Sequence, residues 1–123
     1  MLKLMIVDDS NIIRRKIERS VFGKSFDVVG TAKNGLDAIK RVGELNPEVV
    51  TMDLTMPEMD GIDCIEGIMQ QNNNIRILVV SALSDVSTGI EALEKGARGF
   101  LCKPFTDKQL VEALEELTEG LNV

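Results

Sequence analysis

The chain has 123 residues, of which 44% are hydrophobic, and this predicts one globular domain over residues 1–123 with no separate output domain. It contains no histidine, so Ser-His-Asp triads, imidazole metal ligands and a phosphohistidine on this chain are excluded. Acidic residues outnumber basic ones by 20 to 14, and the net charge of −6 disfavours nucleic acid and anionic membranes as partners.

Short apolar segments rich in β-branched residues alternate along the chain with segments of helical periodicity. This alternation predicts an α/β fold, with a five-stranded parallel sheet and helices on both of its faces. The expected strands are 3–7, 26–29, 49–54, 75–80 and 99–101.

Five helices are expected between and after these strands. The first has an apolar stripe at Ile13, Ile17 and Val21 and ends before Gly23, and its basic residues are expected on a solvated face: Arg14, Arg15, Lys16 and Arg19. In the second, Asn34 is the expected N-cap, Asn46 and Pro47 end the helix, and the expected inward residues are Leu36, Ile39, Val42 and Leu45.

The third helix is expected over 62–71. Capping boxes are predicted for the last two, at Thr88 with Glu91 and at Thr106 with Gln109. Gly96 is expected to end the fourth helix, and the fifth is expected to carry Leu110, Val111, Leu114 and Leu117.

The cysteines and the N-terminus indicate a cytoplasmic protein. Cys64 and Cys102 are far apart and form no CxxC motif, so reduced thiols are expected and a zinc site is not. The apolar run 4–7 is too short for a signal-peptide core, and no stretch is long enough to span a membrane.

Polar residues follow four of the predicted strands directly. Asp8 and Asp9 follow the first, Asp53 ends the third, and Ser81 and Lys103 follow the fourth and fifth. In an open parallel sheet these strand ends share one edge, where ligands bind. Each residue alone is explained by helix capping or a loop, but independent caps give no reason for matching chemistry at four strand ends.

Three carboxylates at one edge repel one another and favour a divalent cation. Oxygen ligands without histidine or cysteine suit Mg²⁺, and a lysine and a hydroxyl beside them suit the oxygens of a phosphoryl group. The residues therefore predict a Mg²⁺ site and phosphoryl transfer onto a carboxylate.

Four motifs carry a family resemblance over the whole chain: IVDDS at 6–10, MDLTMPEMDG at 52–61, VVSA at 79–82 and FLCKPF at 100–105. Their combination resembles the receiver domain of two-component response regulators, most closely the stand-alone chemotaxis type. The resemblance implies a flavodoxin-like (βα)5 fold with strand order 2-1-3-4-5.

The resemblance also implies a role for each matching residue. Asp53 matches the aspartate that accepts a phosphoryl group from a histidine kinase. Asp8 and Asp9 match the Mg²⁺-holding pair, and the backbone carbonyl of Thr55 matches a further metal ligand. Lys103 matches the lysine that pairs with phosphoryl oxygens, and a cis peptide before Pro104 is implied.

Ser81 and Phe100 match the hydroxyl and the aromatic ring of the family's switch. Thr55 and Leu83 match two positions that tune loss of the phosphoryl group, and we expect the branched Leu83 to hinder an attacking water. The expected partners are a histidine kinase, docking near exposed Ile12, and a downstream protein such as the flagellar motor switch. The chain itself is expected to be a monomer or a weak dimer.

Two other function classes stay open on sequence alone. A phosphohydrolase with an aspartyl-phosphate intermediate also uses aspartate, Mg²⁺ and lysine, but it usually has an acid where this chain has Thr55. A receiver-fold interaction module, acting as a phosphate sink or connector, would share the fold. We expect a phosphoryl acceptor that is not an enzyme acting on free substrates.

Overall fold

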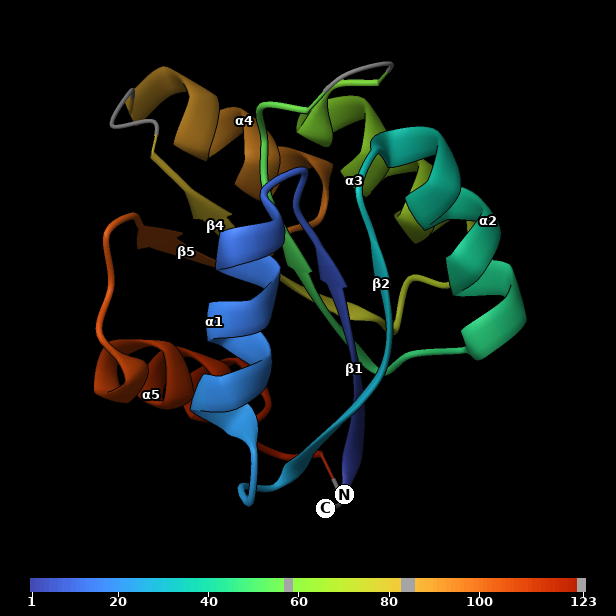
Figure 1. Ribbon diagram of the computed structural model, residues 1–123. Coiled ribbons are helices and arrows are strands. Elements are labelled where there is room, and N and C mark those ends of the chain that lie inside the picture. Colours follow the sequence, from blue (N-terminus) through green and yellow to red (C-terminus); the bar gives the residue numbers. More distant parts are fainter. Residues whose placement is uncertain (57–58, 83–85, 122–123) are drawn as a thin grey trace.

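Within residues 1–56, 59–82 and 86–121, the parts of the chain that the structure describes, five parallel strands form one sheet between two layers of helices in this computed structural model (Figure 1). The strands are β1 (Leu2–Val7), β2 (Phe26–Ala32), β3 (Val49–Met52), β4 (Arg76–Ser81) and β5 (Gly99–Cys102). Their order is β2-β1-β3-β4-β5, which confirms the predicted fold and strand order.

The helices are α1 (Asn11–Val21), α2 (Gly35–Leu45), α3 (Gly61–Gln71), α4 (Val86–Lys95) and α5 (Asp107–Leu117). Helices α1 and α5 cover one face of the sheet, and α2, α3 and α4 cover the other (Figure 1). Each face has its own apolar core, because successive strand residues point to opposite faces. In the described ranges, no helix has both the length and the apolar character needed to cross a membrane.

The helix ends follow the capping residues in the sequence. The side chains of Ser10, Asn34 and Asp60 each accept a hydrogen bond from a backbone N–H of the first turn, and Thr106 with Gln109 forms the predicted capping box. Asn46 ends α2 in a left-handed conformation, with φ of 50°.

Two predictions about helices are wrong. Helix α4 begins at Val86, so Thr88 lies inside its first turn and does not cap it. In α2, Leu36 is 53% exposed, because Ala38 and Val42 occupy the part of the helix surface that contacts the sheet. Both errors arise because a local sequence pattern does not specify where a helix begins or how it is rotated against the sheet.

The strand register brings the predicted site residues to one edge. Val7 is aligned with Met52, Met52 with Val79, and Ser81 with Cys102. Strand β3 ends at Met52, one residue before Asp53, and the Asp53 N–H still donates to the carbonyl of Val7. The residues after β1, β3 and β5 therefore meet beyond the carboxyl ends of the strands.

Candidate functional site: an acidic cluster with a lysine

Asp8 and Asp9 lie where β1 leads into α1. Asp8 is 1% exposed, and its Oδ1 accepts a hydrogen bond of 2.9 Å from the backbone N–H of Ser10. Asp9 is exposed. The strand thus fixes one carboxylate inside the edge, and the next residue presents its carboxylate to solvent.

Asp53 lies between β3 and the loop that leads to α3. It is 3% exposed, and its Oδ1 accepts hydrogen bonds from the backbone N–H of Thr55 at 3.3 Å and from its hydroxyl at 3.4 Å. Gly61, at the start of α3, closes this loop by donating its N–H to the carbonyl of Leu54 at 3.0 Å. A Cβ at Gly61 would lie 2.5 Å from Leu54 Cα and 2.6 Å from the Asp53 carbonyl oxygen, so only glycine permits this approach.

Lys103 extends from the loop after β5 into the acidic cluster. Its Nζ lies 2.7 Å from Oδ2 of Asp8 and 3.8 Å from Oδ2 of Asp53. Its backbone N–H donates to the carbonyl of Ser81, and the following bond to Pro104 is cis, as the resemblance implied. One ammonium group therefore lies beside two buried carboxylates.

The other predicted site residues surround this cluster. Ser81 is fully buried at the end of β4, and Thr55 is exposed. Phe100 is half-buried on β5 and packs against the core under α3 and α4. Two of its ring carbons lie 3.7 Å from the point where a Cβ added to Gly89 would lie. Leu83 lies outside the described residues, as do Pro57 and Glu58 of the second motif.

The electrostatics of the cluster are unfavourable to an ionised Asp53. Burial raises the pKa of the Asp53 carboxyl above its usual value of 3.8, and the neighbouring Asp8 raises it further. Lys103 and the hydrogen bond from the Thr55 N–H oppose this rise in pKa only in part. The arrangement is short of positive charge.

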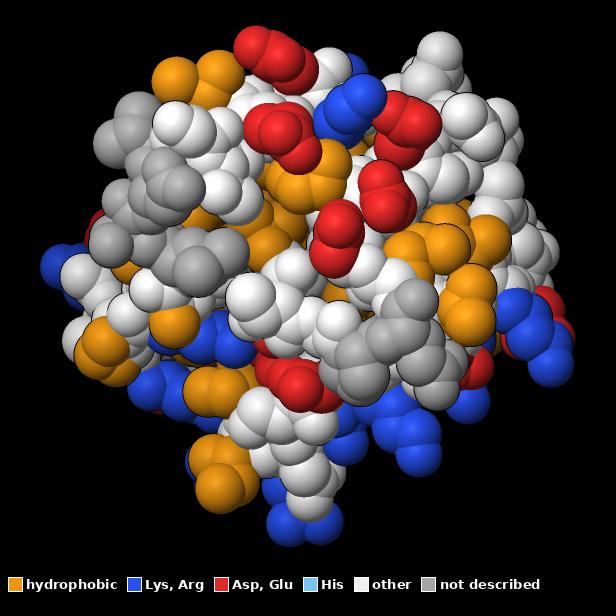
Figure 2. Space-filling model, turned by 90° about the horizontal axis from the view of Figure 1, so that it is seen from above, with side chains coloured by type: hydrophobic (Ala, Val, Ile, Leu, Met, Phe, Trp, Pro, Cys, Tyr) orange, Lys and Arg blue, Asp and Glu red, His pale blue; other side chains and the backbone are white. Residues whose placement is uncertain are grey.

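The donor set fits a divalent cation. One carboxylate oxygen from each of Asp8, Asp9 and Asp53 lies within 4.8 Å of the others. Hard oxygen ligands at such spacing suit Mg²⁺, and a double positive charge would offset the repulsion that raises the Asp53 pKa. Figure 2 looks onto this edge and shows acidic side chains from the centre to the top of the view, with a basic side chain among the upper ones and most other basic side chains around the lower half.

Arg15 and Arg19 of α1 are exposed, as predicted for a solvated basic face, but the prediction is wrong for Arg14 and Lys16. Arg14 is half-buried and donates from Nη1 to the carbonyl oxygen of Asp8 at 2.6 Å. Lys16 is also half-buried and contacts the loop after β5. The sequence held one signal for this: Lys16 and Ser20 lie three residues after Ile13 and Ile17, so they border the apolar stripe.

Comparison with known proteins agrees with this geometry. A family model described as "Response regulator receiver domain" matches residues 4–115. The chain is 41% identical over 116 residues to the chemotaxis protein CheY of Listeria monocytogenes, covering 94% of this chain and 98% of that one. Identity to CheY of Thermotoga maritima is 40% over 117 residues, covering 95% and 98%.

A solved structure with a similar fold is the CheX-CheY-BeF3-Mg+2 complex from Borrelia burgdorferi. The TM-score is 0.90 and the identity 30%, covering 94% of this chain and 88% of that one. That CheY was therefore solved together with CheX, BeF3 and Mg²⁺.

Proposed function

Because this chain belongs to the response regulator receiver family, we propose that it is a phospho-accepting regulator in which Asp53 takes the phosphoryl group. The observation that carries the assignment is the position of Asp53. Its buried carboxylate lies between Thr55, which holds Oδ1, and Lys103, which lies toward Oδ2. Asp8 and Asp9 fit the acceptor role less well. Asp8 already receives the closer contact from Lys103, and Asp9 is exposed and not enclosed by other groups.

The charges around Asp53 account for the transfer. An Asp53 oxygen attacks the phosphorus of a phosphohistidine, the new P–O bond forms as the P–N bond breaks, and the imidazole leaves with the electron pair. Asp8, Asp9, Asp53 and the backbone carbonyl of Thr55 would hold Mg²⁺, which supplies positive charge for the incoming phosphoryl oxygens. Lys103 supplies a further positive charge beside Oδ2 of Asp53 and helps to align the group.

Ser81 and Phe100 then carry the change to the surface. A phosphoryl group on Asp53 adds oxygens that attract the Ser81 hydroxyl, and bonding in only one loop arrangement shifts the population toward that arrangement. Phe100 is half-buried beside α4, so its ring is in a position to respond. Thr55 and Leu83 are the proposed residues that tune the lifetime of the phosphoryl group.

Exposed apolar side chains support two partner surfaces. Ile12, at the start of α1, is 77% exposed near the acidic edge and is the proposed contact for a histidine kinase. On α4, Ile90 and Leu93 are 50% and 48% exposed and offer a surface for a downstream protein. The similarity to chemotaxis proteins supports a role in chemotaxis, with the flagellar motor switch as the candidate target.

A phosphohydrolase is the less favoured function. Thr55 occupies the position two residues after Asp53, where such enzymes usually carry an acid, and it uses both its N–H and its hydroxyl to hold Asp53. A phosphoryl acceptor that acts on no free substrate is therefore the proposed activity. Its expected place in the cell is the cytoplasm, beside the kinase domain.

The test is intact-mass measurement after incubation with acetyl phosphate, with Mg²⁺ or with EDTA. We expect wild type to gain one phosphoryl group only with Mg²⁺, and Asp53→Asn to gain none. Asp27→Asn is the matched control, because Asp27 is an exposed aspartate on β2, away from the cluster, and it should behave as wild type.

Three results would contradict the proposal. A gain of a phosphoryl group by Asp53→Asn would show that a residue other than Asp53 is the acceptor. No gain by wild type, together with no binding of beryllofluoride, would reject the receiver chemistry. Steady release of phosphate from an added phosphate ester, beyond one equivalent, would favour the hydrolase.

A further inference from the structure

Helix α1 contacts the loop that carries Lys103. The Nζ of Lys16 donates a hydrogen bond of 2.5 Å to the carbonyl oxygen of Phe105, and it lies 4.8 Å from the centre of the Phe105 ring. Phe105 directly precedes Thr106, the N-cap of α5, so its carbonyl lies outside the hydrogen-bond ladder of that helix. Lys16 gives this carbonyl a charged donor from another helix.

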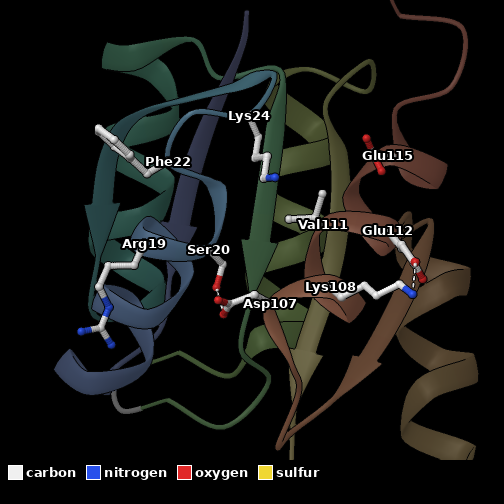
Figure 3. Close-up of a pocket in the computed structure, with 9 residues that line it drawn as sticks. All are labelled: Arg19, Ser20, Phe22, Lys24, Asp107, Lys108, Val111, Glu112 and Glu115. Atoms are coloured by element: carbon white, nitrogen blue, oxygen red, sulfur yellow. Dashed lines mark hydrogen bonds and ion pairs between the residues drawn. The ribbon is translucent and has the colours of Figure 1, made fainter.

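A second contact joins the same two segments. The Ser20 hydroxyl, one turn after Lys16, donates to Oδ1 of Asp107 at 2.6 Å. Figure 3 shows these two side chains pointing toward each other between α1 and α5, in a groove of about 490 Å³. The start of α5 is therefore fixed to α1 at two successive helical turns.

The loop between β5 and α5 is short, so these contacts limit the position of Lys103. Cys102 ends β5 and Thr106 caps α5, and Lys103 lies only two residues before Phe105. The Phe105 side chain is 3% exposed in the core beneath α1 and α5. With its ring buried and its carbonyl bound to Lys16, Phe105 is an anchor for this loop.

We propose that Lys16 is a positioning residue for phosphoryl transfer, which holds the β5–α5 loop so that the Lys103 ammonium lies between Asp8 and Asp53. Lys16 does not touch the acidic cluster and acts through Phe105. The proposal rests on the proposed function, since it concerns the group that would receive the phosphoryl oxygens.

The mechanism depends on geometric accuracy. The Nζ atom of Lys103 lies 3.8 Å from Oδ2 of Asp53. Because the lysine side chain is flexible, the position of its backbone decides how much time the ammonium group spends beside Asp53. Without Lys16, the Phe105 carbonyl would accept a hydrogen bond from water in place of the bond from a charged donor. The β5–α5 loop would then sample more positions. The three carboxylates of the proposed cation site keep their positions in this variant, because Asp8 and Asp9 follow β1 and Asp53 follows β3.

The experiment compares Lys16→Met, Lys16→Arg and the control Arg15→Met. Methionine keeps most of the apolar stem and removes the charged donor. Arginine retains a charged donor. Arg15 is the exposed neighbour on the same helix, so its replacement removes the same charge without touching the loop.

The first readout is amide hydrogen exchange. The Lys103 N–H donates to the Ser81 carbonyl, so its exchange reports on the loop, whereas the Asp53 N–H, bonded to Val7, reports on the sheet. We expect Lys16→Met to speed exchange at Lys103 by about 10-fold, as expected for loss of one charged hydrogen bond, with exchange at Asp53 unchanged. Lys16→Arg and Arg15→Met should match wild type at both amides.

The second readout is phosphorylation by acetyl phosphate. We expect Lys16→Met to lower the maximal rate by about 3- to 10-fold without raising the half-saturating Mg²⁺ concentration, and Lys16→Arg to restore the rate. Equal rates for Lys16→Met and Arg15→Met would overturn the proposal, as would faster exchange at Asp53 as well as Lys103, which would indicate general loosening. Failure of wild type to accept phosphoryl would instead reject the proposed function.

Discussion

Lys103 lies closer to Asp8 than to Asp53, with Nζ to carboxylate distances of 2.7 Å and 3.8 Å. The lysine thus neutralises a proposed metal ligand while it stays within reach of the proposed acceptor. A divalent cation bound at Asp8 would compete with Lys103 for this carboxylate, so we expect cation binding to release the lysine toward Asp53.

This competition predicts opposite effects for Lys103→Met. We expect Mg²⁺ affinity to rise by about 3- to 10-fold, because the carboxylates lose their competing cation, and phosphorylation to slow by more than about 10-fold. Calorimetric Mg²⁺ titration and intact-mass kinetics measure the two effects. Lys108→Met, which removes an 85% exposed lysine on α5, should change neither, and weaker Mg²⁺ binding by Lys103→Met would contradict the argument.

Removing the charge of Asp53 should stabilise the fold. Burial and Asp8 raise the pKa of the Asp53 carboxyl, so its ionised form costs folding free energy at neutral pH. In EDTA at pH 7 we expect Asp53→Asn to raise the free energy of unfolding by about 1 kcal/mol, measured by urea unfolding with circular dichroism. Asp27→Asn should show no such gain.

The pH dependence of the stability difference between Asp53→Asn and wild type follows from the direction of the Asp53 pKa shift. The folded state binds the Asp53 proton more tightly than the unfolded state, so wild type gains stability relative to Asp53→Asn as the pH falls through the raised folded pKa. The gain is complete below the unfolded value near 3.8. A stability difference that grows on acidification would contradict this assignment.

Gly61→Ala should damage the fold at the site. The added Cβ would meet backbone atoms of Leu54 and Asp53, which cannot rotate away as a side-chain tip can. We expect a loss of about 1–3 kcal/mol in the free energy of unfolding and slower phosphorylation. In contrast, among the described residues a Cβ at Gly89 in α4 would meet the Phe100 ring at 3.7 Å, an ordinary contact distance, so Gly89→Ala should keep or raise stability.

The two cysteines should react at very different rates. Burial raises the pKa of the Cys64 thiol to about 12, with a smaller contribution from Asp60, whereas Cys102 is exposed at the end of β5. At pH 8 we expect one fast equivalent of thiol modification, lost in Cys102→Ser, and a second only after denaturation. Two fast equivalents in the native protein would show that the core around Cys64 opens readily.

The site was more predictable from sequence than the helix surfaces. Asp53 and Lys103 each directly follow an apolar run, and in a parallel sheet the strand ends alone bring them together. Thr88 and Leu36 depend on where a helix begins and how it is rotated, which are set by packing outside the local window. The bonds from Arg14 to Asp8 and from Lys16 to Phe105 end on backbone carbonyl groups, which every residue has, so no side-chain pattern indicates them.

The contact between Lys103 and Asp8 joins residues 95 positions apart, and this has a consequence during synthesis. Asp8 and Asp53 leave the ribosome well before Lys103, so a growing chain holds these acids without their lysine for a period of seconds, at roughly 5–20 residues added per second. Pairing of β1 with β3 then brings the two carboxylates together at an electrostatic cost. Free Mg²⁺ in the cell would reduce this cost, and the cation would thereby favour early formation of the sheet before β5 is available.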